Sequence, residues 1–291
     1  LSFMLSLTFL CAPAWALTLV SQGSSNYTIV IPDEPIPAEQ TAAQELAHHV
    51  KQMAGAELPI VGESQFDGSH GILLGNNRHL KKLGIEPAWE QLDKEGYLLR
   101  TANGHLIIAG GRPRGTLYGV YALLEDHLGC RWFAPDTTVI PQRETVELPH
   151  LDVTRRPAFE YRDPKLYAGG PRSAWWRRHF DSQYVARTRN SGTFVHTSVH
   201  PMDERYGGYF NIIRFGHNLS SLVPPKLYAA EYPEYFAWHD GRCVTEGDLE
   251  LCLTHPDVAS VAAGTLRRWM RAEPDADMLF IGQSDTNKYC M

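Results

Sequence analysis

Short apolar runs alternate along this chain with longer stretches of helical periodicity. The runs NYTIVIP and GILLGN read as strands, and the stretch from Pro37 to Met53 places apolar side chains on one helical face, with Gly55 just after it as a C-cap. The segment YLLRTANGHLIIAGG predicts a hairpin, because Asn103-Gly104 accepts the positive φ angles of a tight turn. Strands and helices in this compact order predict an α/β fold with a small mixed sheet.

A Pro-bearing stretch carries the chain out of this first domain near Leu151. We therefore expect residues 17–150 to form the small α/β domain, including a second helix from about Arg114 to His127. Beyond it AFEYRD, TFVHTS and MLFIGQS read as strands, and VASVAAGTLRRWMRA reads as a helix. Strands joined by helical crossovers pair in parallel, which favours an incomplete (β/α)8 barrel for residues 151–291. The polar end MLFIGQSDTNKYCM, without a closing helix, predicts a C-terminal truncation.

The first sixteen residues form an apolar run that ends in small residues at Ala14 and Ala16. This pattern predicts a signal peptide, export to the periplasm or the medium, and a mature chain that begins at Leu17. The run is too short for a comfortable membrane span, so no span is expected after its removal. A buried N-terminal helix is the alternative. Cys11 fits a lipoprotein signal poorly, because no small residue precedes it.

The distribution of charge argues against nucleic acid as a partner. The chain has 27 Lys and Arg against 33 Asp and Glu, a formal net charge of -6, and no basic stretch that would follow a polyanion. Arg112 and Arg114 open a helix after two glycines, but GGRPRG lacks the Lys-Ser/Thr pair of a P-loop, so we interpret them as domain scaffolding. His196 and His200 stand four apart in a segment that favours extended chain, and we predict no metal site there.

Longer motifs carry a family resemblance. GGRPRGTLYGVYALLEDHLGCRWFAPD resembles the last helix and strand of the N-terminal domain of family 67 α-glucuronidases and, more remotely, of family 20 β-hexosaminidases. RRPAFEYRD, FGHNLSSLVP, EYPEYFAWHDGR, LCLTHPDV and GQSDTNKYC together resemble the bacterial domain-of-unknown-function family 4838. The resemblance runs from about Leu17 to the end of the chain. It implies a glycoside-hydrolase-like barrel behind an accessory domain, without a known substrate.

Cleavage of a glycosidic bond usually needs two carboxyl groups that flank it, and barrel enzymes place such groups at the carboxyl ends of strands. Asp285 fits this place, because it follows the apolar run from Met278 to Ile281 in a loop of hydrogen-bonding side chains that includes Asn287. The resemblance to hexosaminidases implies an acidic pair there, but the neighbour is Thr286. A polar loop whose Asp caps the next helix is the alternative. We expect the second carboxylate beyond residue 291.

Four further side chains are candidates for substrate binding. Arg162 ends AFEYR, and the family 20 resemblance implies an Arg there that holds sugar hydroxyls; a salt bridge with Asp163 or another acid is the alternative. Trp176 and Tyr235 come from a group of aromatic residues whose faces suit sugar rings, although most of that group is expected to be core. His217 in RFGHNLSS stands in a loop that can present its ring, with a capping or buried structural role as the alternative.

The segment CVTEGDLELC predicts a second hairpin, with its turn at Gly247-Asp248. Counting outward from that turn pairs Cys243 with Cys252 at a non-hydrogen-bonded position, where side chains approach most closely. Export would place both cysteines in an oxidising compartment, so we predict a disulfide between them. Free thiols, or a bond to Cys290, are the alternatives.

Together these patterns predict an exported glycoside-hydrolase-like protein that acts on polysaccharide or oligosaccharide by acid-base hydrolysis, without a cofactor. A non-catalytic carbohydrate-binding protein that uses the same cleft is the alternative, and a metal-dependent hydrolase is a weaker third. We expect no hydrolysis by this fragment alone, because half a barrel lacks half of its site loops. The sugar, the linkage, the stereochemical outcome and the oligomeric state do not follow from the sequence.

Overall fold

The computed structural model describes residues 17–162, 182–191, 203–247 and 249–288. They form two compact units: the first contains the described residues up to 191 together with 203–209, and the second contains those from 210 onward. The expected strand TFVHTS, Trp176 and the pair His196 and His200 lie outside the described residues. Within the described ranges, no helix has the length and apolar character that a membrane crossing requires.

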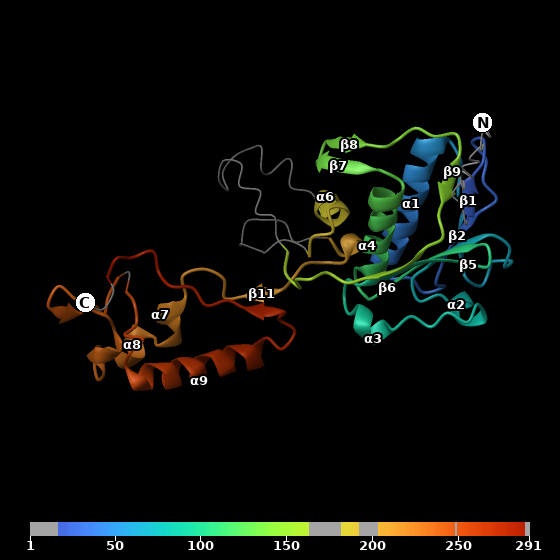
Figure 1. The fold of residues 1–291 in the computed structure, drawn as a ribbon. Helices are drawn as coiled ribbons and strands as arrows, with labels where there is room; N and C mark the ends of the chain where they lie inside the picture. The colour runs from blue at the N-terminus through green and yellow to red at the C-terminus, as the bar shows by residue number, and fades with distance from the viewer. Residues whose placement is uncertain (1–16, 163–181, 192–202, 248, 289–291) are drawn as a thin grey trace, which may run out of the picture. The chain divides into compact units, whose positions relative to one another are not determined.

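A six-stranded mixed sheet forms the centre of the first unit, with strand order β10-β5-β6-β4-β2-β3 (Figure 1). Its strands are β2 (Thr28–Ile31), β3 (Ile60–Gly62), β4 (Gly71–Leu74), β5 (Tyr97–Ala102), β6 (His105–Gly110) and β10 (Asp152–Arg155). The neighbouring strands β6, β4, β2 and β3 pair in parallel, and β5 pairs antiparallel with β6 and with β10. The predicted hairpin is confirmed, since Asn103 and Gly104 have φ angles of 50° and 80° and Ala102 lies opposite His105.

Helices cover both faces of this sheet. On one face lie α1 (Pro37–Ala54) and α4 (Gly115–Ala122), which continues as the π-helical segment η1 (Leu123–His127); α2 (His79–Lys82) and α3 (Trp89–Leu92) lie on the other (Figure 1). Strand alternation divides the core accordingly, because Ile72 and Leu74 pack with α1 and α4 while Leu73 packs with Leu80 of α2. Both predicted helices are confirmed, and Gly55 ends α1 with a φ angle of 73°.

Smaller elements complete the first unit. They are β1 (Leu17–Val20), which pairs with β9 (Val146–Leu148), the hairpin β7 (Arg131–Ala134) and β8 (Thr137–Val139), the helix α6 (Ser182–Arg187) and the 3-10 segment η2 (Glu204–Tyr206). The first unit continues past Leu151, because β10 pairs with β5. The predicted strand AFEYRD is wrong for residues 158–162. The backbone of Arg162 exchanges hydrogen bonds with Ser191 instead of a strand partner.

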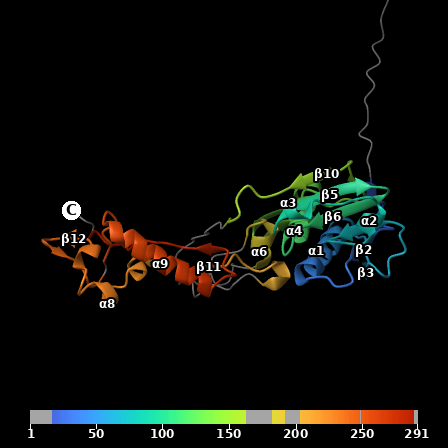
Figure 2. The same cartoon turned by 90° about the horizontal axis from the view of Figure 1, so that it is seen from below.

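The second unit has two short parallel strands, β11 (Ile212–Ile213) and β14 (Met278–Leu279). Between these strands in the chain come α7 (Leu219–Leu222), α8 (Pro225–Tyr228), the 3-10 segment η3 (Pro233–Tyr235), the hairpin β12 (Trp238–His239) and β13 (Arg242–Cys243), and the long helix α9 (Pro256–Ala272). Figure 1 labels α7, and Figure 2 labels α8, β12 and α9. The predicted helix is confirmed as α9, and the predicted strand MLFIGQS is confirmed for its first two residues. The described residues of this unit form a parallel pair but no closed barrel.

The predicted register of Cys243 opposite Cys252 is wrong. The hairpin turns at Asp240-Gly241, whose φ angles of 50° and 75° fit a type I′ turn, so Cys243 lies opposite Trp238. The N–H of Cys252 donates to the carbonyl of Tyr235, so the segment from Tyr235 to Trp238 separates the two cysteines. Among the described residues, no disulfide joins Cys243 to Cys252. The disulfide stays a prediction that has lost its supporting register.

The burial of Cys130 in the core of the first unit leads to a testable prediction. Its thiol is fully buried, and burial raises its pKa to about 11. Since the thiolate is the reactive form, we expect iodoacetamide at about pH 8 to leave Cys130 unmodified in the native chain and to modify it after denaturation. Peptide mapping by mass spectrometry measures this, with the denatured protein as the reference for full labelling of Cys130. Equal labelling of Cys130 in native and denatured protein would contradict the buried site.

Candidate functional site

Two predicted site residues, His217 and Asp285, meet at one edge of the second unit. His217 follows β11 and Asp285 follows β14, and because these strands are parallel their carboxyl ends lie at the same edge. The two side chains approach to 3.4 Å between His217 Nε2 and Asp285 Oδ2. They are 56% and 93% exposed, so a ligand at this edge can reach both.

The tautomer of His217 follows from its other nitrogen. Nδ1 lies 2.6 Å from the carbonyl oxygen of Gln283, which can only accept, so Nδ1 carries the hydrogen and donates it. In the neutral ring, Nε2 is then an acceptor, and it donates to Asp285 only when the imidazole is protonated. The contact of His217 with Asp285 is therefore an ion pair for the charged imidazole alone, while the bond to Gln283 holds the ring in both states.

Asn218 ties together the two loops that carry His217 and Asp285. Its amide Nδ2 donates to the carbonyl of Phe280 at 2.9 Å, and its Oδ1 accepts the N–H of Gly282 at 3.1 Å. Its backbone N–H also donates to the carbonyl of Gly282, at 3.0 Å. This buried amide was not among the predicted site residues. Its signal in the sequence is its position directly after His217 in a Gly-flanked loop, before a short helix.

A second carboxylate, Glu250, lies beneath this edge and was also missed. Its side chain is buried, with 4% of the residue exposed, and Oε1 accepts the N–H of Ser284 at 2.6 Å. The hydroxyl of Ser284 donates to the carbonyl of Leu249 at 3.3 Å. Because Ser284 directly precedes Asp285, standard bond lengths place Glu250 Oε1 within roughly 10 Å of the Asp285 carboxyl carbon. Glu250 thus supports the loop that presents Asp285. We call the set His217, Asn218, Glu250 and Asp285 the strand-end site.

Two other predicted residues of the second unit, Tyr235 and Asn287, differ in their exposure to solvent. Tyr235 is a core residue, and its ring stacks on that of Tyr232 with centroids 4.9 Å apart and planes 16° apart. The imidazole of His255 lies 4.9 Å from it, between ring centroids. Tyr232 is the exposed ring of this stack. Asn287 is exposed, in the same loop as Asp285.

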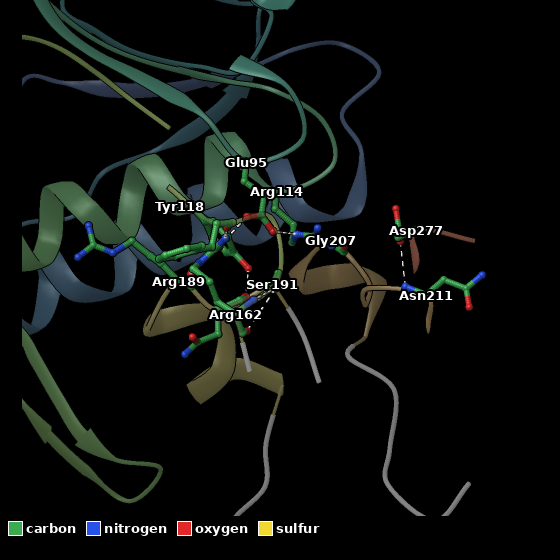
Figure 3. Close-up of polar contacts among 11 residues, drawn as sticks. Glu95, Arg114, Tyr118, Arg162, Arg189, Ser191, Gly207, Asn211 and Asp277 are labelled. Carbon is green, nitrogen blue, oxygen red and sulfur yellow. Dashed lines mark hydrogen bonds and ion pairs between the residues drawn. The ribbon is translucent and has the colours of Figure 1, made fainter. Parts of the chain in front are cut away.

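Arg162 is engaged inside the first unit (Figure 3). Its Nη2 lies 2.6 Å from Oε2 of Glu95, its Nε and Nη2 donate to the carbonyl of Arg189, and its Nη1 donates to the carbonyl of Phe159. These contacts match the alternative interpretation of Arg162, in which it forms a salt bridge, and Glu95 is the acidic partner. Sugar binding by Arg162 stays a prediction.

The interpretation of Arg112 and Arg114 as scaffolding agrees with their contacts. Arg114 Nε lies 2.8 Å from Oε1 of Glu95, and its Nη1 donates to the carbonyl of Gly207 at 3.1 Å. Arg112 donates through Nε and Nη2 to both carboxylate oxygens of Glu39. Across the described ranges, no group of three or more His, Cys, Asp or Glu side chains is arranged to hold a metal ion.

Comparison with known proteins assigns the chain to a family. The family model described as "Domain of unknown function (DUF4838)" matches residues 132–291, which is more than half of the chain. The model described as "Glycosyl hydrolase family 67 N-terminus" matches residues 19–123. No curated protein matches.

Among solved structures, a family 115 4-O-methyl-α-glucuronidase, described as specific for decorated arabinogalactans, is 16% identical, with a TM-score of 0.48. The match covers 94% of this chain and 37% of that enzyme, so the chain spans little more than a third of that enzyme's length. The resemblance stated from the sequence motifs is confirmed by the two family models. The chain belongs to the DUF4838 family and carries an N-terminal domain of the glycosyl hydrolase family 67 type.

Proposed function

We propose that this chain is a glycoside-hydrolase-like protein whose strand-end site binds oligosaccharide. The observation that carries the proposal is the meeting of His217 and Asp285 at the carboxyl ends of two parallel strands, with the buried carboxylate Glu250 beneath them. The family 67 N-terminal match supports carbohydrate as the ligand class. In this proposal β11 and β14 are strands of an incomplete (β/α)8 barrel, and the protein is exported through its first sixteen residues.

Asp285 and Glu250 supply the two kinds of carboxyl group that hydrolysis of a glycosidic bond requires. Asp285 is open to solvent and can approach a sugar, while Glu250 is withdrawn from water. The upper limit of roughly 10 Å on their separation is compatible with the distances of about 5 to 9.5 Å between the two carboxyl groups of retaining and inverting glycosidases. His217 contacts Asp285, and its imidazole, when protonated, places a positive charge beside that carboxylate. This arrangement makes Glu250 a candidate for the second carboxylate within the chain.

A non-catalytic carbohydrate-binding protein is the second candidate. One observation favours it: Oε1 of Glu250 accepts the backbone N–H of Ser284, and the residue is almost fully buried. A carboxyl group held this way supports the loop, and its Oε1 is already committed to a backbone partner. Binding without hydrolysis then follows from the same site, with Asp285 and His217 as ligand contacts.

Titration calorimetry with neutral and uronic-acid-bearing oligosaccharides tests the proposed site. We expect Asp285→Asn to weaken binding at least roughly tenfold, because a charge-assisted hydrogen bond to a sugar hydroxyl is lost. The control is Asp240→Asn, since Asp240 is also exposed and lies 3.5 Å from a His239 nitrogen, in the hairpin β12-β13. Binding of no oligosaccharide, or equal weakening by both variants, contradicts the proposal.

A reducing-sugar assay on the same variants separates the two candidate functions. If the protein hydrolyses a bound oligosaccharide and Glu250 is the second carboxylate, Glu250→Gln should lower kcat by about 10² to 10⁴ while the Kd changes little. If Glu250 only supports the loop, the glutamine side chain still accepts the Ser284 N–H and activity is kept. If the protein binds the oligosaccharide without hydrolysing it, and Asp285→Asn abolishes that binding, the protein is the non-catalytic carbohydrate-binding protein.

A further inference from the structure

A cavity of about 210 Å³ lies in the first unit. Its wall includes Phe66, His79 and His105, with Asp67 and Lys82 also lining it. The volume is below the range of roughly 300 to 1,000 Å³ that is common for sites of drug-sized ligands, so an occupant would be small. None of these five residues belongs to the strand-end site, which lies in the second unit.

The two histidines offer opposite hydrogen-bonding groups. His105 Nδ1 accepts the N–H of Gly71 at 3.1 Å, and burial lowers its pKa, so the neutral ring carries its hydrogen on Nε2. His79 Nε2 lies 2.9 Å from the carbonyl oxygen of Glu63, which can only accept, so the neutral form of His79 has its lone pair on Nδ1. Within the described ranges, neither His105 Nε2 nor His79 Nδ1 has a hydrogen-bond partner. A ligand that donates and accepts would satisfy both.

Phe66 provides an apolar surface beside both histidines. Its ring contacts those of His79 and His105 edge-on, with centroids 5.2 Å and 6.2 Å away. Gly71 makes room for it, because a Cβ atom at Gly71 would lie 2.7 Å from Phe66 Cζ. An aromatic side chain flanked by a donor and an acceptor is the combination that a sugar ring requires, with its apolar C–H groups and its hydroxyls.

The charges around the cavity favour a neutral ligand. Asp67 and Lys82 carry opposite charges, and His105 is neutral. One oxygen of Asp67 accepts the N–H of Ser69 at 2.9 Å, and this bond lowers the pKa of the carboxyl group, which therefore stays ionised. An anion would gain from Lys82 but would meet the Asp67 carboxylate. The wall therefore has no excess of positive charge.

We propose that this cavity binds one neutral pyranose ring, with a sugar face on Phe66, a hydroxyl donating to His79 Nδ1 and another accepting from His105 Nε2. The site is separate from the proposed function, since no residue of the strand-end site contributes to it. Sugar binding at the cavity and at the strand-end site can therefore be measured independently of each other.

Titration of the ¹⁵N-histidine-labelled chain with methyl glucoside or methyl galactoside, followed by imidazole NMR, tests this proposal. We expect the ring nitrogens of His79 and His105 to shift with a Kd in the roughly millimolar range that few contacts support. His79→Phe keeps a ring but removes the lone pair, and should weaken binding about tenfold or more. Lys81→Ala, at an exposed residue of α2 that does not line the cavity, and Asp285→Asn in the second unit should leave the Kd of this cavity unchanged.

Two results would overturn the proposal. One is the absence of histidine shifts up to the solubility limit of both sugars in folded protein. The other is binding of glucuronate or inorganic phosphate in their place, lost in Lys82→Ala, which would make the cavity an anion site. If His79→Phe fails to fold, Phe66→Ala gives the same test by removing the apolar surface, and unchanged sugar affinity in that variant contradicts the pose.

Discussion

Replacing Gly111 by alanine is expected to destabilise the first unit by more than about 3 kcal/mol, the upper part of the usual cost of overpacking. A Cβ atom at Gly111 would lie 1.6 Å from the carbonyl oxygen of Asp93 and 3.2 Å from that of Leu92. Both blocking atoms belong to the backbone, so no side-chain rotation relieves the overlap. Single domains are commonly stable by about 5 to 15 kcal/mol, so this one methyl group removes a large share.

The crowding at Gly111 continues through its neighbours, where the end of β6 meets the start of α4. A Cβ at Gly110 would lie 2.1 Å from the carbonyl carbon of Gly115, and a Cβ at Gly115 would lie 2.2 Å from the carbonyl oxygen of Gly96. Close approach also allows hydrogen bonds, since Gly111 donates to Gly96 at 2.9 Å and Gly115 donates to Gly111 at 2.7 Å. These glycines join a strand, a loop and a helix without intervening side chains.

Urea unfolding followed by far-ultraviolet circular dichroism measures the effect of Gly111→Ala. The matched control is Gly84→Ala in the same unit. Gly84 has a φ angle of 68° but nothing within 4 Å of a Cβ, so only the backbone strain remains, about 1 to 2 kcal/mol. Similar midpoints for the two variants would show that the backbone contact at Gly111 is not as close as described.

Replacing Glu95 by leucine should cost about 3 to 5 kcal/mol of unfolding free energy, the range for removing one partner of a buried ion pair. Glu95 accepts from Arg114 and Arg162 with its two oxygens, at 2.8 Å and 2.6 Å (Figure 3). The side chain of Arg114 is only 4% exposed and would be left without a carboxylate partner among the described residues. Arg162→Ala should cost less, because Arg162 is 20% exposed and Glu95 keeps Arg114.

The control for Glu95→Leu is Glu57→Leu. Glu57 pairs with Lys51 at 2.5 Å, but both side chains are more than half exposed, so loss of that pair should cost no more than about 1 kcal/mol. Thermal unfolding of the three variants gives the ranking. Sugar affinity measured on Arg162→Ala then tests its predicted role in the site. Weakened sugar binding in a variant of near-native stability would favour substrate contact, and the reverse would favour scaffolding.

Local chemistry explains which elements were predictable. Asn103-Gly104 accepts positive φ angles and lies between two apolar runs, so its hairpin follows from a few adjacent residues. The same holds for α1, where Pro37 fits the first turn and Gly55 supplies the left-handed cap. The hairpin at Asp240-Gly241 carried an equally strong signal. It was missed because the cysteine spacing favoured a turn further along the chain.

The strand-end site was predictable only in part. Asp285 and His217 each follow a short apolar run, which is a local signal for the end of a strand. The contacts of Glu250 with Ser284 and of Asn218 with Gly282 join residues 34 and 64 positions apart, and a single sequence does not show such pairings. AFEYRD alternates like a strand, yet Phe159 is exposed and Arg162 bonds Ser191, because pairing partners decide what a local pattern becomes.

Hydrogen-deuterium exchange of the chain, with and without a bound oligosaccharide, tests the central claim most directly. The claim is that carbohydrate binds at the carboxyl ends of β11 and β14. We predict slower exchange in peptides that cover 214–219 and 280–286, because a bound sugar would cover the loops that carry His217 and Asp285. Saturating oligosaccharide that leaves the exchange of both segments unchanged would contradict the claim.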